Sequence, residues 1–475
     1  MIDKELINMD AVMESAMAGL IEVSKYVPFE KWEAGKKLKL LLVGYNGARN
    51  TGADVRVEAM VKQFYHIFGE DSIEIGVMTL DASHSANYFK SPTELVQFST
   101  VFFKDLFKTA SAYHAAVLCE GSCFKSKFAN ALTTFFFGAA GIMKAQGKTC
   151  VAYGSEAGKM DDVLKWFVKR YCDQAYIISR TEPSAKVVEQ LGFKGDIGTD
   201  TAWTFQPGPK EAAIELLKKN GWDGKQPIVG AAVINPFYWP IKPDFKKFLK
   251  MKASGEKWSD NYDKWYFFST SEERTASYER YIGAVASAIN TFVEKHNAFP
   301  VIIGMERLDF GPNNDLNEKL NKKAPIFCSA DYNGYEMTAI LWQLSMLVTS
   351  RYHARVLSMP GGVPAIAVSM DERLENLLAE SGHLDDYYLR VDEPDLKEKL
   401  PIVMDKLWKN REKVRTEIYQ TIPGYLRKMA QMGKDYKDYL RKNYPGIQLK
   451  EDPIELMGYL PPLYPELKDI VEKYG

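Results

Sequence analysis

The feature that most limits the fold of this chain is a recurring pattern of short apolar runs that end in glycine and small polar residues. The first run, residues 38–43, leads into a glycine-rich loop at 44–54, and helical periodicity follows the loop. Four further runs lie at 73–79, 115–119, 149–153 and 175–179. Short apolar runs that alternate with helical patterns are typical of parallel strands covered by helices on both faces. The pattern predicts an α/β protein with a doubly wound sheet.

The same pattern starts again after a segment at 206–209 that contains two prolines and a glycine, which is typical of a crossing between domains. Further apolar runs lie at 227–234, at 300–303 and directly before Arg351. A chain of 475 residues is too long for one hydrophobic core, so we predict two doubly wound, Rossmann-like domains. Their predicted bounds are 37–205 and 206–388, with a helical N-terminal arm at 1–36 and a helical C-terminal extension at 389–475.

Two segments fall outside this repeated pattern. Residues near 235–273 are rich in aromatic and lysine side chains, and we favour a packed surface insertion over a sugar-binding platform. In the C-terminal extension, helical periodicity runs from 396 to 432, and Pro423 followed by Gly424 predicts a break in that helix.

The composition argues against several classes of function. Lys and Arg number 61 against 62 Asp and Glu, so a formal net charge of −1 gives no overall attraction to nucleic acid. The five cysteines are odd in number and scattered, so we predict no metal site and a cytoplasmic protein. The acidic start lacks a signal peptide, and the uncharged run at 128–143 is shorter than the roughly 20 residues of a membrane span. We interpret that run as a buried helix, which leaves peripheral association with the inner face of a membrane open.

Arg351, His353 and Arg355 lie within five residues, where a strand is predicted to meet a helix. Open α/β sheets bind ligands at the carboxyl ends of their strands, and the first amides of a helix add partial positive charge there. If the helix begins early enough, the two arginines share one face, with His353 beside them as a proton carrier. This predicts a site for phosphate or carboxylate. The alternative is that the arginines cap a helix or pair with acids, and that His353 is a core residue.

The glycine-rich loop at 44–54 has neither the G-x-G-x-x-G of a nicotinamide site nor the G-K-[ST] ending of a P-loop. Glycine still permits close approach of the backbone to a ligand, so Gly47, Asn50, Gly52 and Asp54 are candidate binding residues. A helix cap formed by Asn50 or Asp54 is an equally good interpretation. The strand ends at 120–122 and 154–156 are ambiguous in the same way.

Several segments occur in an order that resembles a known family. Arg180, Glu182 and Ser184 follow a predicted strand, a Leu-Gly pair follows at 191–192, and Asp-x-Ala-Trp at 200–203 ends the first domain. The strongest match is Thr-Ser-Arg-Tyr-His-Ala at 349–354, with Gly-Val-Pro at 362–364. With the glycine-rich loop, these segments resemble the polysaccharide pyruvyl transferase family over residues 38–385. The chain departs from the family at Asp54, where the acid of the loop is displaced by one position, and at Thr349, where the family has Ser.

The resemblance implies a fold similar to GT-B glycosyltransferases, with two domains that face a cleft. It also implies transfer of pyruvate from phosphoenolpyruvate to two sugar hydroxyls as a ketal, with release of phosphate. In this reaction His353 would be the general acid and base, and Arg351 and Arg355 would hold the phosphate and carboxylate. Arg180 and Ser369 are further candidates for substrate binding, although Arg180 is open to a structural role.

The resemblance implies no cofactor, since phosphoenolpyruvate is the donor substrate, and its acceptor would be a glycan that is free or lipid-linked. Two alternatives remain. One is a GT-B-like glycosyltransferase that takes a nucleotide sugar, because Arg351 and Arg355 would hold its phosphates equally well. The other is a binding protein without catalytic activity that kept the fold. The sequence makes no prediction of the oligomeric state.

Overall fold

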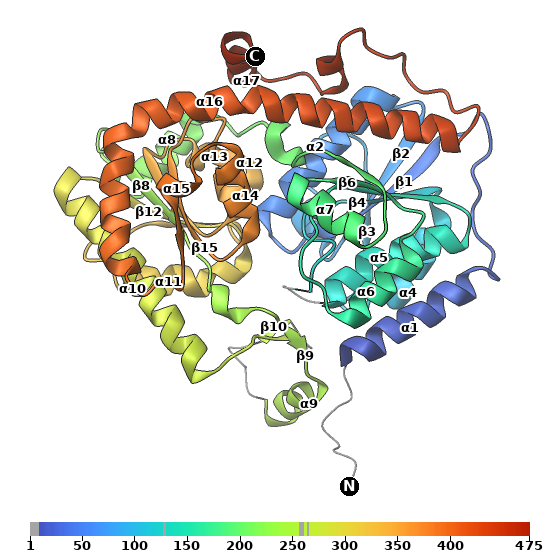
Figure 1. Ribbon diagram of the computed structural model, residues 1–475, viewed down its shortest axis with the longest axis horizontal. Coiled ribbons are helices and arrows are strands. Elements are labelled where there is room, and N and C mark those ends of the chain that lie inside the picture. Colours follow the sequence, from blue (N-terminus) through green and yellow to red (C-terminus); the bar gives the residue numbers. More distant parts are fainter. Residues whose placement is uncertain (1–8, 127–129, 256–260, 264–265) are drawn as a thin grey trace.

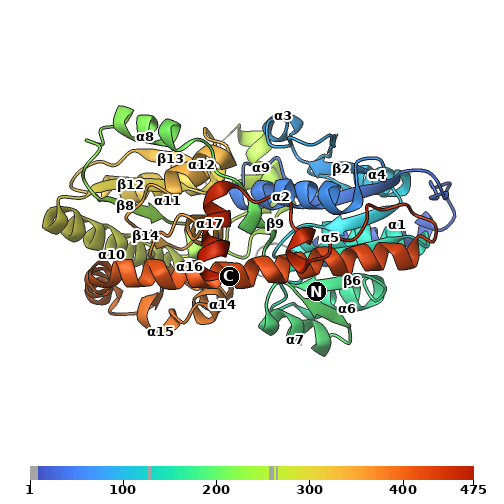
Figure 2. The same cartoon turned by 90° about the horizontal axis from the view of Figure 1, so that it is seen from above.

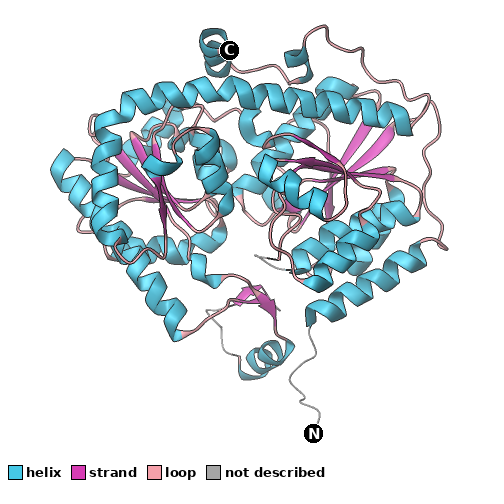
Figure 3. Ribbon diagram, viewed as in Figure 1, coloured by secondary structure: helices cyan, strands magenta, loops and turns pink. Residues whose placement is uncertain are grey.

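The computed structural model describes residues 9–126, 130–255, 261–263 and 266–475. Two α/β lobes lie side by side, and each is a sheet with helices on both faces (Figures 1 and 3). We call the lobe built on β1 to β7 the first lobe and the lobe built on β8 and β12 to β16 the second lobe. The strands that pair within each of these sheets are parallel.

The sheet of the first lobe has seven strands in the order β3-β2-β1-β4-β5-β6-β7. The five predicted strands are present as β1 (Leu38–Asn46), β2 (Ile73–Thr79), β4 (Ala115–Leu118), β5 (Thr149–Ser155) and β6 (Tyr176–Ser179). The sequence did not predict the two edge strands, β3 (Glu94–Gln97) and β7 (Gly195–Ile197). Both are short and partly or fully exposed, so neither has the apolar run of a central strand.

The helices of the first lobe are α2 (Thr51–Phe68), α3 (Ala82–Ser85), α4 (Phe103–Ala112), α5 (Asn130–Ala145), α6 (Asp162–Tyr171) and α7 (Glu182–Gln190). The uncharged run predicted as a buried helix forms α5, which is almost entirely buried over its described length. Helix α1 (Met9–Ser24) packs on α5, where Met17 and Ile21 fill the space above Gly138 and Gly141. In the part of the chain that the structure describes, no helix has the length and apolar character of a membrane span.

The sheet of the second lobe has six strands in the order β13-β12-β8-β14-β15-β16. Its strands are β8 (Ile228–Ala232), β12 (Phe299–Gly304), β13 (Ile326–Cys328), β14 (Met346–Thr349), β15 (Ala365–Ser369) and β16 (Tyr388–Arg390). The surrounding helices are α8 (Lys210–Lys219), α10 (Glu272–His296), α11 (Phe310–Glu318), α12 (Gly334–Leu341), α13 (Tyr352–Ser358), α14 (Glu372–Glu380) and α15 (Leu384–Tyr387). The reversal of strand order beside β8 and β14 places a crevice at their carboxyl ends.

The aromatic segment near 235–273 folds as a small unit of its own. It contains β9 (Lys242–Pro243), α9 (Phe245–Ser254), β10 (Asn261–Asp263) and β11 (Tyr266–Phe267), and these strands form a sheet in the order β10-β11-β9. Figure 1 shows this unit below the two lobes, at the side where they face one another.

Helix α16 (Leu396–Asn443) is 48 residues long and continues through Pro401 and Pro423, so the predicted break is wrong. A proline inside a helix removes one backbone hydrogen bond and costs about 3 kcal/mol. Burial of Ile422, Tyr425 and Leu426 on either side of Pro423 offsets that loss. The helix begins against α10 in the second lobe and ends over the first, as the view from above shows (Figure 2). After it come the last short helix, η4 (Leu456–Tyr459), and α17 (Pro465–Tyr474).

Candidate functional site

A cleft lies where the carboxyl ends of the two sheets face one another. Strand ends and helix starts of both lobes contribute its lining, which includes Asn50, Gly52, Glu120, Ser350, Arg351, His353, Ser369, Asp371 and Arg373. The cleft therefore combines the ligand-binding edges of two doubly wound sheets.

The glycine-rich loop of the first lobe contacts the second lobe directly. Helix α2 begins at Thr51, earlier than the sequence indicated, and the Asn50 side chain caps it by accepting from the Ala53 amide at 3.1 Å. The Thr51 amide donates to the Met305 carbonyl at 2.8 Å, and Asn50 forms a β-bridge with Glu306. The first turn of α2 is thus held at the floor of the cleft by both lobes.

Gly47 and Asp54, two of the predicted binding residues in this loop, are not among the described residues that line the cleft. Gly47 has φ of 77°, and a Cβ atom there would lie 2.2 Å from Thr79 Oγ1, so only glycine fits. The Asp54 carboxylate accepts from the Gly47 amide at 3.5 Å, and burial raises the pKa of Asp54 to about 8. Both residues shape the loop.

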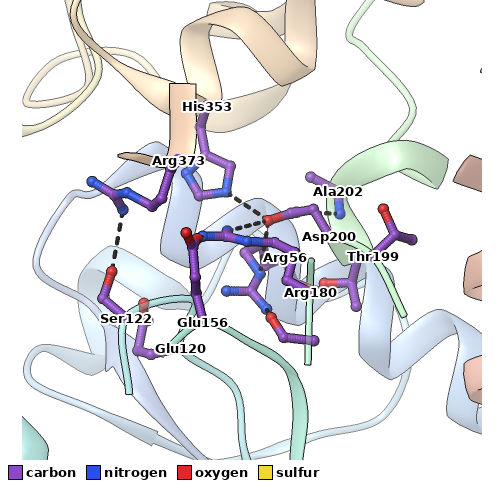
Figure 4. A network of polar contacts seen from close by, with 12 residues as sticks. Arg56, Glu120, Ser122, Glu156, Arg180, Thr199, Asp200, Ala202, His353 and Arg373 are labelled. Carbon is purple, nitrogen blue, oxygen red and sulfur yellow. Dashed lines mark hydrogen bonds and ion pairs between the residues drawn. The ribbon is translucent and has the colours of Figure 1, made fainter. Parts of the chain in front are cut away.

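His353, near the start of α13, projects from the second lobe towards the first (Figure 4). Its Nε2 atom lies 3.3 Å from Asp200 Oδ2. On the other side of the ring, Nδ1 lies so close to Gly52 that a Cβ atom there would be 2.0 Å away. Burial lowers the pKa of His353, and Asp200 opposes that shift.

Asp200 joins His353 to a buried network of charges in the first lobe (Figure 4). Its Oδ2 atom accepts from Arg180 at 2.8 Å and lies 3.5 Å from Arg56 Nε. Burial by itself would raise the pKa of Asp200, but Arg56, His353 and Arg180 together hold it well below its usual range. Asp200 is therefore a carboxylate that faces the imidazole, although it is fully shielded from water.

Arg180, which the sequence left open between substrate binding and structure, lies in this network and outside the lining of the cleft. It forms an ion pair with Glu156 as well as with Asp200, and its guanidinium stacks over the Tyr352 ring at 4.4 Å. The Glu156 carboxylate also lies 3.5 Å from Lys125 Nζ. The strand ends at 120–122 and 154–156 thus supply one cleft residue, Glu120, and one network residue, Glu156.

Arg351 lines the cleft and is fixed by two acids of the second lobe. Its Nε atom donates to both oxygens of Asp309, at 3.0 and 2.8 Å, and its NH2 group donates to Glu306 at 3.0 Å. Burial raises the pKa of Asp309 to about 6, against the opposing charge of Arg351. Glu306 and Asp309 were missed in the sequence, where their only signal was two acids directly after a predicted strand.

Arg355 lies away from the cleft, so the expectation that it shares a face with Arg351 is wrong. Helix α13 begins at Tyr352, and Arg351 precedes it in an extended conformation with φ of −103° and ψ of 118°. The Arg355 guanidinium is buried and donates to the Val363 carbonyl at 2.8 Å. Burial lowers the pKa of Arg355 to about 10.

The end of β15 brings a second arginine to the cleft. Ser369 Oγ accepts from the Asp371 amide at 2.9 Å, and Asp371 binds the Arg373 guanidinium with both carboxylate oxygens. From the second lobe, Arg373 reaches Ser122 Oγ in the first at 3.3 Å. The sequence predicted Ser369 but missed Arg373, because an arginine within the first turn of a helix carries no motif.

Within the described residues, no group of three or more His, Cys, Asp or Glu side chains is placed to hold a metal ion. The cleft lining includes the imidazole of His353, the carboxylates of Glu120 and Asp371 and the guanidinium groups of Arg351 and Arg373. Such a set can bind an anionic ligand and move a proton at one atom.

No protein-family model matches the sequence, and no curated protein matches it. Solved structures do match the fold. A Listeria monocytogenes protein described as a UDP-N-acetylglucosamine 2-epimerase is 11% identical, with a TM-score of 0.52 over 88% of this chain and 100% of that one. The Anabaena protein HepE in complex with UDP-glucose is 10% identical, with a TM-score of 0.51 over 85% of this chain and 100% of that one. The likeness confirms the predicted fold class, a GT-B-like pair of α/β domains.

Proposed function

We propose that this protein is a sugar-active enzyme that binds a nucleotide sugar in the cleft and transfers the sugar, as GT-B-like glycosyltransferases do. The observation that carries the proposal is the His353–Asp200 pair, which spans the two lobes at the cleft. The two UDP-sugar proteins of similar fold support this class of donor.

In this proposal His353 is the general base that takes the proton of the acceptor hydroxyl. The Asp200 carboxylate accepts the Nε2 proton, which leaves the lone pair on Nδ1, at the first turn of α2. Because burial lowers the pKa of His353, its neutral form predominates near pH 7. Asp200 also stabilises the imidazolium that forms when the proton moves, as a buried acid does for a histidine base in general.

The walls of the cleft suit a nucleoside diphosphate. Ile234, Pro236 and Met305 form an apolar wall on the second lobe, against which a base and ribose would pack. Arg351 would face the negative charge of the diphosphate.

A second candidate is pyruvyl transfer from phosphoenolpyruvate, and one specific observation favours it. The segments at 200–203 and 349–354, which resemble the polysaccharide pyruvyl transferase family, meet in space through Asp200 and His353. In that reaction His353 would protonate the enol carbon, a sugar hydroxyl would attack the resulting cation, phosphate would leave, and a second hydroxyl would close the ketal. Arg351 would hold the donor's phosphate or carboxylate.

The two candidates separate in a binding experiment. Isothermal titration calorimetry would measure the binding of UDP, GDP, CDP and phosphoenolpyruvate to the unchanged protein and to Arg351→Lys. The matched control is Arg390→Lys, because Arg390 is an exposed arginine of the second lobe. We expect one nucleotide to bind and to lose affinity only in Arg351→Lys. Binding of phosphoenolpyruvate alone would replace the leading proposal with pyruvyl transfer, and binding of neither class would contradict both.

A further inference from the structure

A second pocket, which we call the apolar pocket, lies in the first lobe between the end of β1, helix α5 and the aromatic insertion. Aromatic and aliphatic side chains form most of its wall, among them Tyr45, Phe98, Phe102, Leu132, Phe135 and Ile241. No charged side chain occurs among the described residues that line it.

The aromatic wall of this pocket is held firmly in place. Phe135 stacks on Phe98 with ring centroids 4.7 Å apart and meets Phe102 edge to face at 5.0 Å. All three side chains are buried in the core of the first lobe, so the wall is part of the fold and does not depend on a ligand. When an apolar group covers a preformed apolar surface, binding is favourable because water leaves both surfaces.

A third space lies next to both the apolar pocket and the cleft. Tyr45, Leu132 and Ile241 line this space and the apolar pocket, and Glu120 and Arg351 line this space and the cleft. The backbone amide of Tyr45 also donates to Glu120 Oε1 at 3.0 Å, which joins the rim of the apolar pocket to a cleft carboxylate. A molecule that extends through this third space can place its polar end in the cleft and an apolar group in the pocket.

We propose that the apolar pocket binds an uncharged apolar group of the acceptor, next to the hydroxyl that reacts. This inference rests on the proposed sugar transfer, because it assigns the donor to the wall of the second lobe and the acceptor to the first. An alkyl chain and an aromatic ring share the chemistry that the pocket recognises. The acceptor is thus an amphiphilic molecule, with sugar at the cleft and hydrocarbon or arene in the pocket.

Direct binding without any donor tests this inference. Calorimetry would compare octyl glucoside below its micelle concentration, phenyl glucoside and methyl glucoside. We expect saturable binding of octyl or phenyl glucoside at least tenfold tighter than that of methyl glucoside, and the stronger of the two identifies the apolar group. Equal affinity for all three would overturn the inference.

Two variants locate the binding. Leu132→Asp places a charge at the rim shared with the third space, and Thr100→Phe fills the pocket from its loop side without changing α5. Ile402→Asp, at an exposed position of α16, is the matched control. We expect either pocket variant to weaken octyl or phenyl glucoside binding at least tenfold and the control to leave it unchanged. An unchanged affinity in folded Thr100→Phe would contradict the assignment.

The outcomes also separate this inference from the proposed function. Glycosides that bind in the pocket while no nucleotide binds in the cleft would support the apolar pocket and contradict sugar transfer. A nucleotide that binds while every glycoside binds equally weakly would support the donor site and contradict the acceptor assignment.

Discussion

The imidazole of His353 lies against the backbone of Gly52, so closely that a Cβ atom on Gly52 would be 2.0 Å from Nδ1. His353 belongs to the second lobe and Gly52 to the first. The contact therefore depends on the absence of a side chain in the first turn of α2, and it sets how near the two lobes approach at the cleft.

Replacing Gly52 by alanine tests this contact. We expect Gly52→Ala to displace the imidazole and reduce turnover at least about tenfold, because small errors in the position of a proton-transfer group slow the reaction strongly. Steady-state kinetics measure the loss. Gly283→Ala, in the middle of α10 with open space around the new methyl group, should keep full activity and gain up to about 1 kcal/mol in free energy of unfolding. Full activity in Gly52→Ala would contradict the placement of His353.

Removing the proposed base should abolish most of the chemistry and leave the fold intact. For His353→Asn we expect kcat to fall roughly 100- to 10,000-fold, the usual contribution of a general acid or base. Circular dichroism and thermal unfolding check that the variant folds. A variant that unfolds instead would show that His353 is a core residue.

Asp200 should govern both the basicity of His353 and the stability of the first lobe. Asp200 raises the pKa of His353, so Asp200→Asn should lower it further and move the acidic limb of kcat/KM to lower pH. The same change removes the carboxylate that pairs with Arg56 and one of the two that pair with Arg180, which we expect to reduce the free energy of unfolding by about 3 to 5 kcal/mol. Urea unfolding measures the loss, and Asp469→Asn, on the surface of α17, is the control. An acidic limb that stays in place would contradict the pairing.

The two arginines of the 351–355 segment should behave differently. Arg351→Lys loses the paired contact with Asp309 at the cleft, so we expect the KM of the donor to rise at least about tenfold. Arg355→Lys should leave KM unchanged and lower the free energy of unfolding by about 1 to 3 kcal/mol, because Arg355 donates to a carbonyl in the core. Comparable increases in KM would contradict the placement of Arg355.

His114 should make the fold sensitive to acid. Its Nδ1 atom accepts from the Lys39 amide at 3.0 Å, and burial lowers its pKa from 6.5 to about 4. The unfolded chain therefore binds a proton that the folded chain does not, so stability present above pH 6.5 is lost as the pH falls from about 6.5 towards 4. Urea unfolding at pH 7 and pH 5 measures the loss. His114→Asn, whose side-chain oxygen can accept from the same amide, should show a smaller one, and an equal loss in both proteins would contradict this assignment.

The sequence predicted β1, β2, β4, β5 and β6 of the first sheet and β8, β12 and β14 of the second, because each is an apolar run that helices cover on both faces. The sequence-based prediction failed where the local sequence pattern does not reflect the position of the segment in the fold. The strand Glu94–Gln97 is partly exposed at an edge, so it lacks that signal, and Pro423 lies inside a helix that tertiary contacts hold together. Arg355 was misplaced because helix α13 begins at Tyr352, a boundary that sequence patterns rarely fix to one residue.

The site itself was predicted only in part. His353, Arg351, Asn50, Gly52 and Ser369 do line one cleft, since all of them follow strands of parallel sheets. The partner of His353 could not be found in this way, because Asp200 comes from the other lobe and the contact depends on how the lobes pack. Glu306 and Asp309 were missed for a related reason, because their role is to hold the Arg351 guanidinium and that contact depends on the fold.

Helix α16 has a consequence for how this protein is made. Tyr436, near the end of the helix, packs on Phe64, Phe68 and Tyr153 in the core of the first lobe, with ring centroids 5.3 to 5.8 Å apart. These partners are translated long before Tyr436, and the whole second lobe is translated between them. Most chains fold from the N-terminus as the ribosome releases them. Here the first lobe lacks part of its core until the second lobe has been translated. The nascent chain therefore exposes part of the apolar core of the first lobe until helix α16 packs on it.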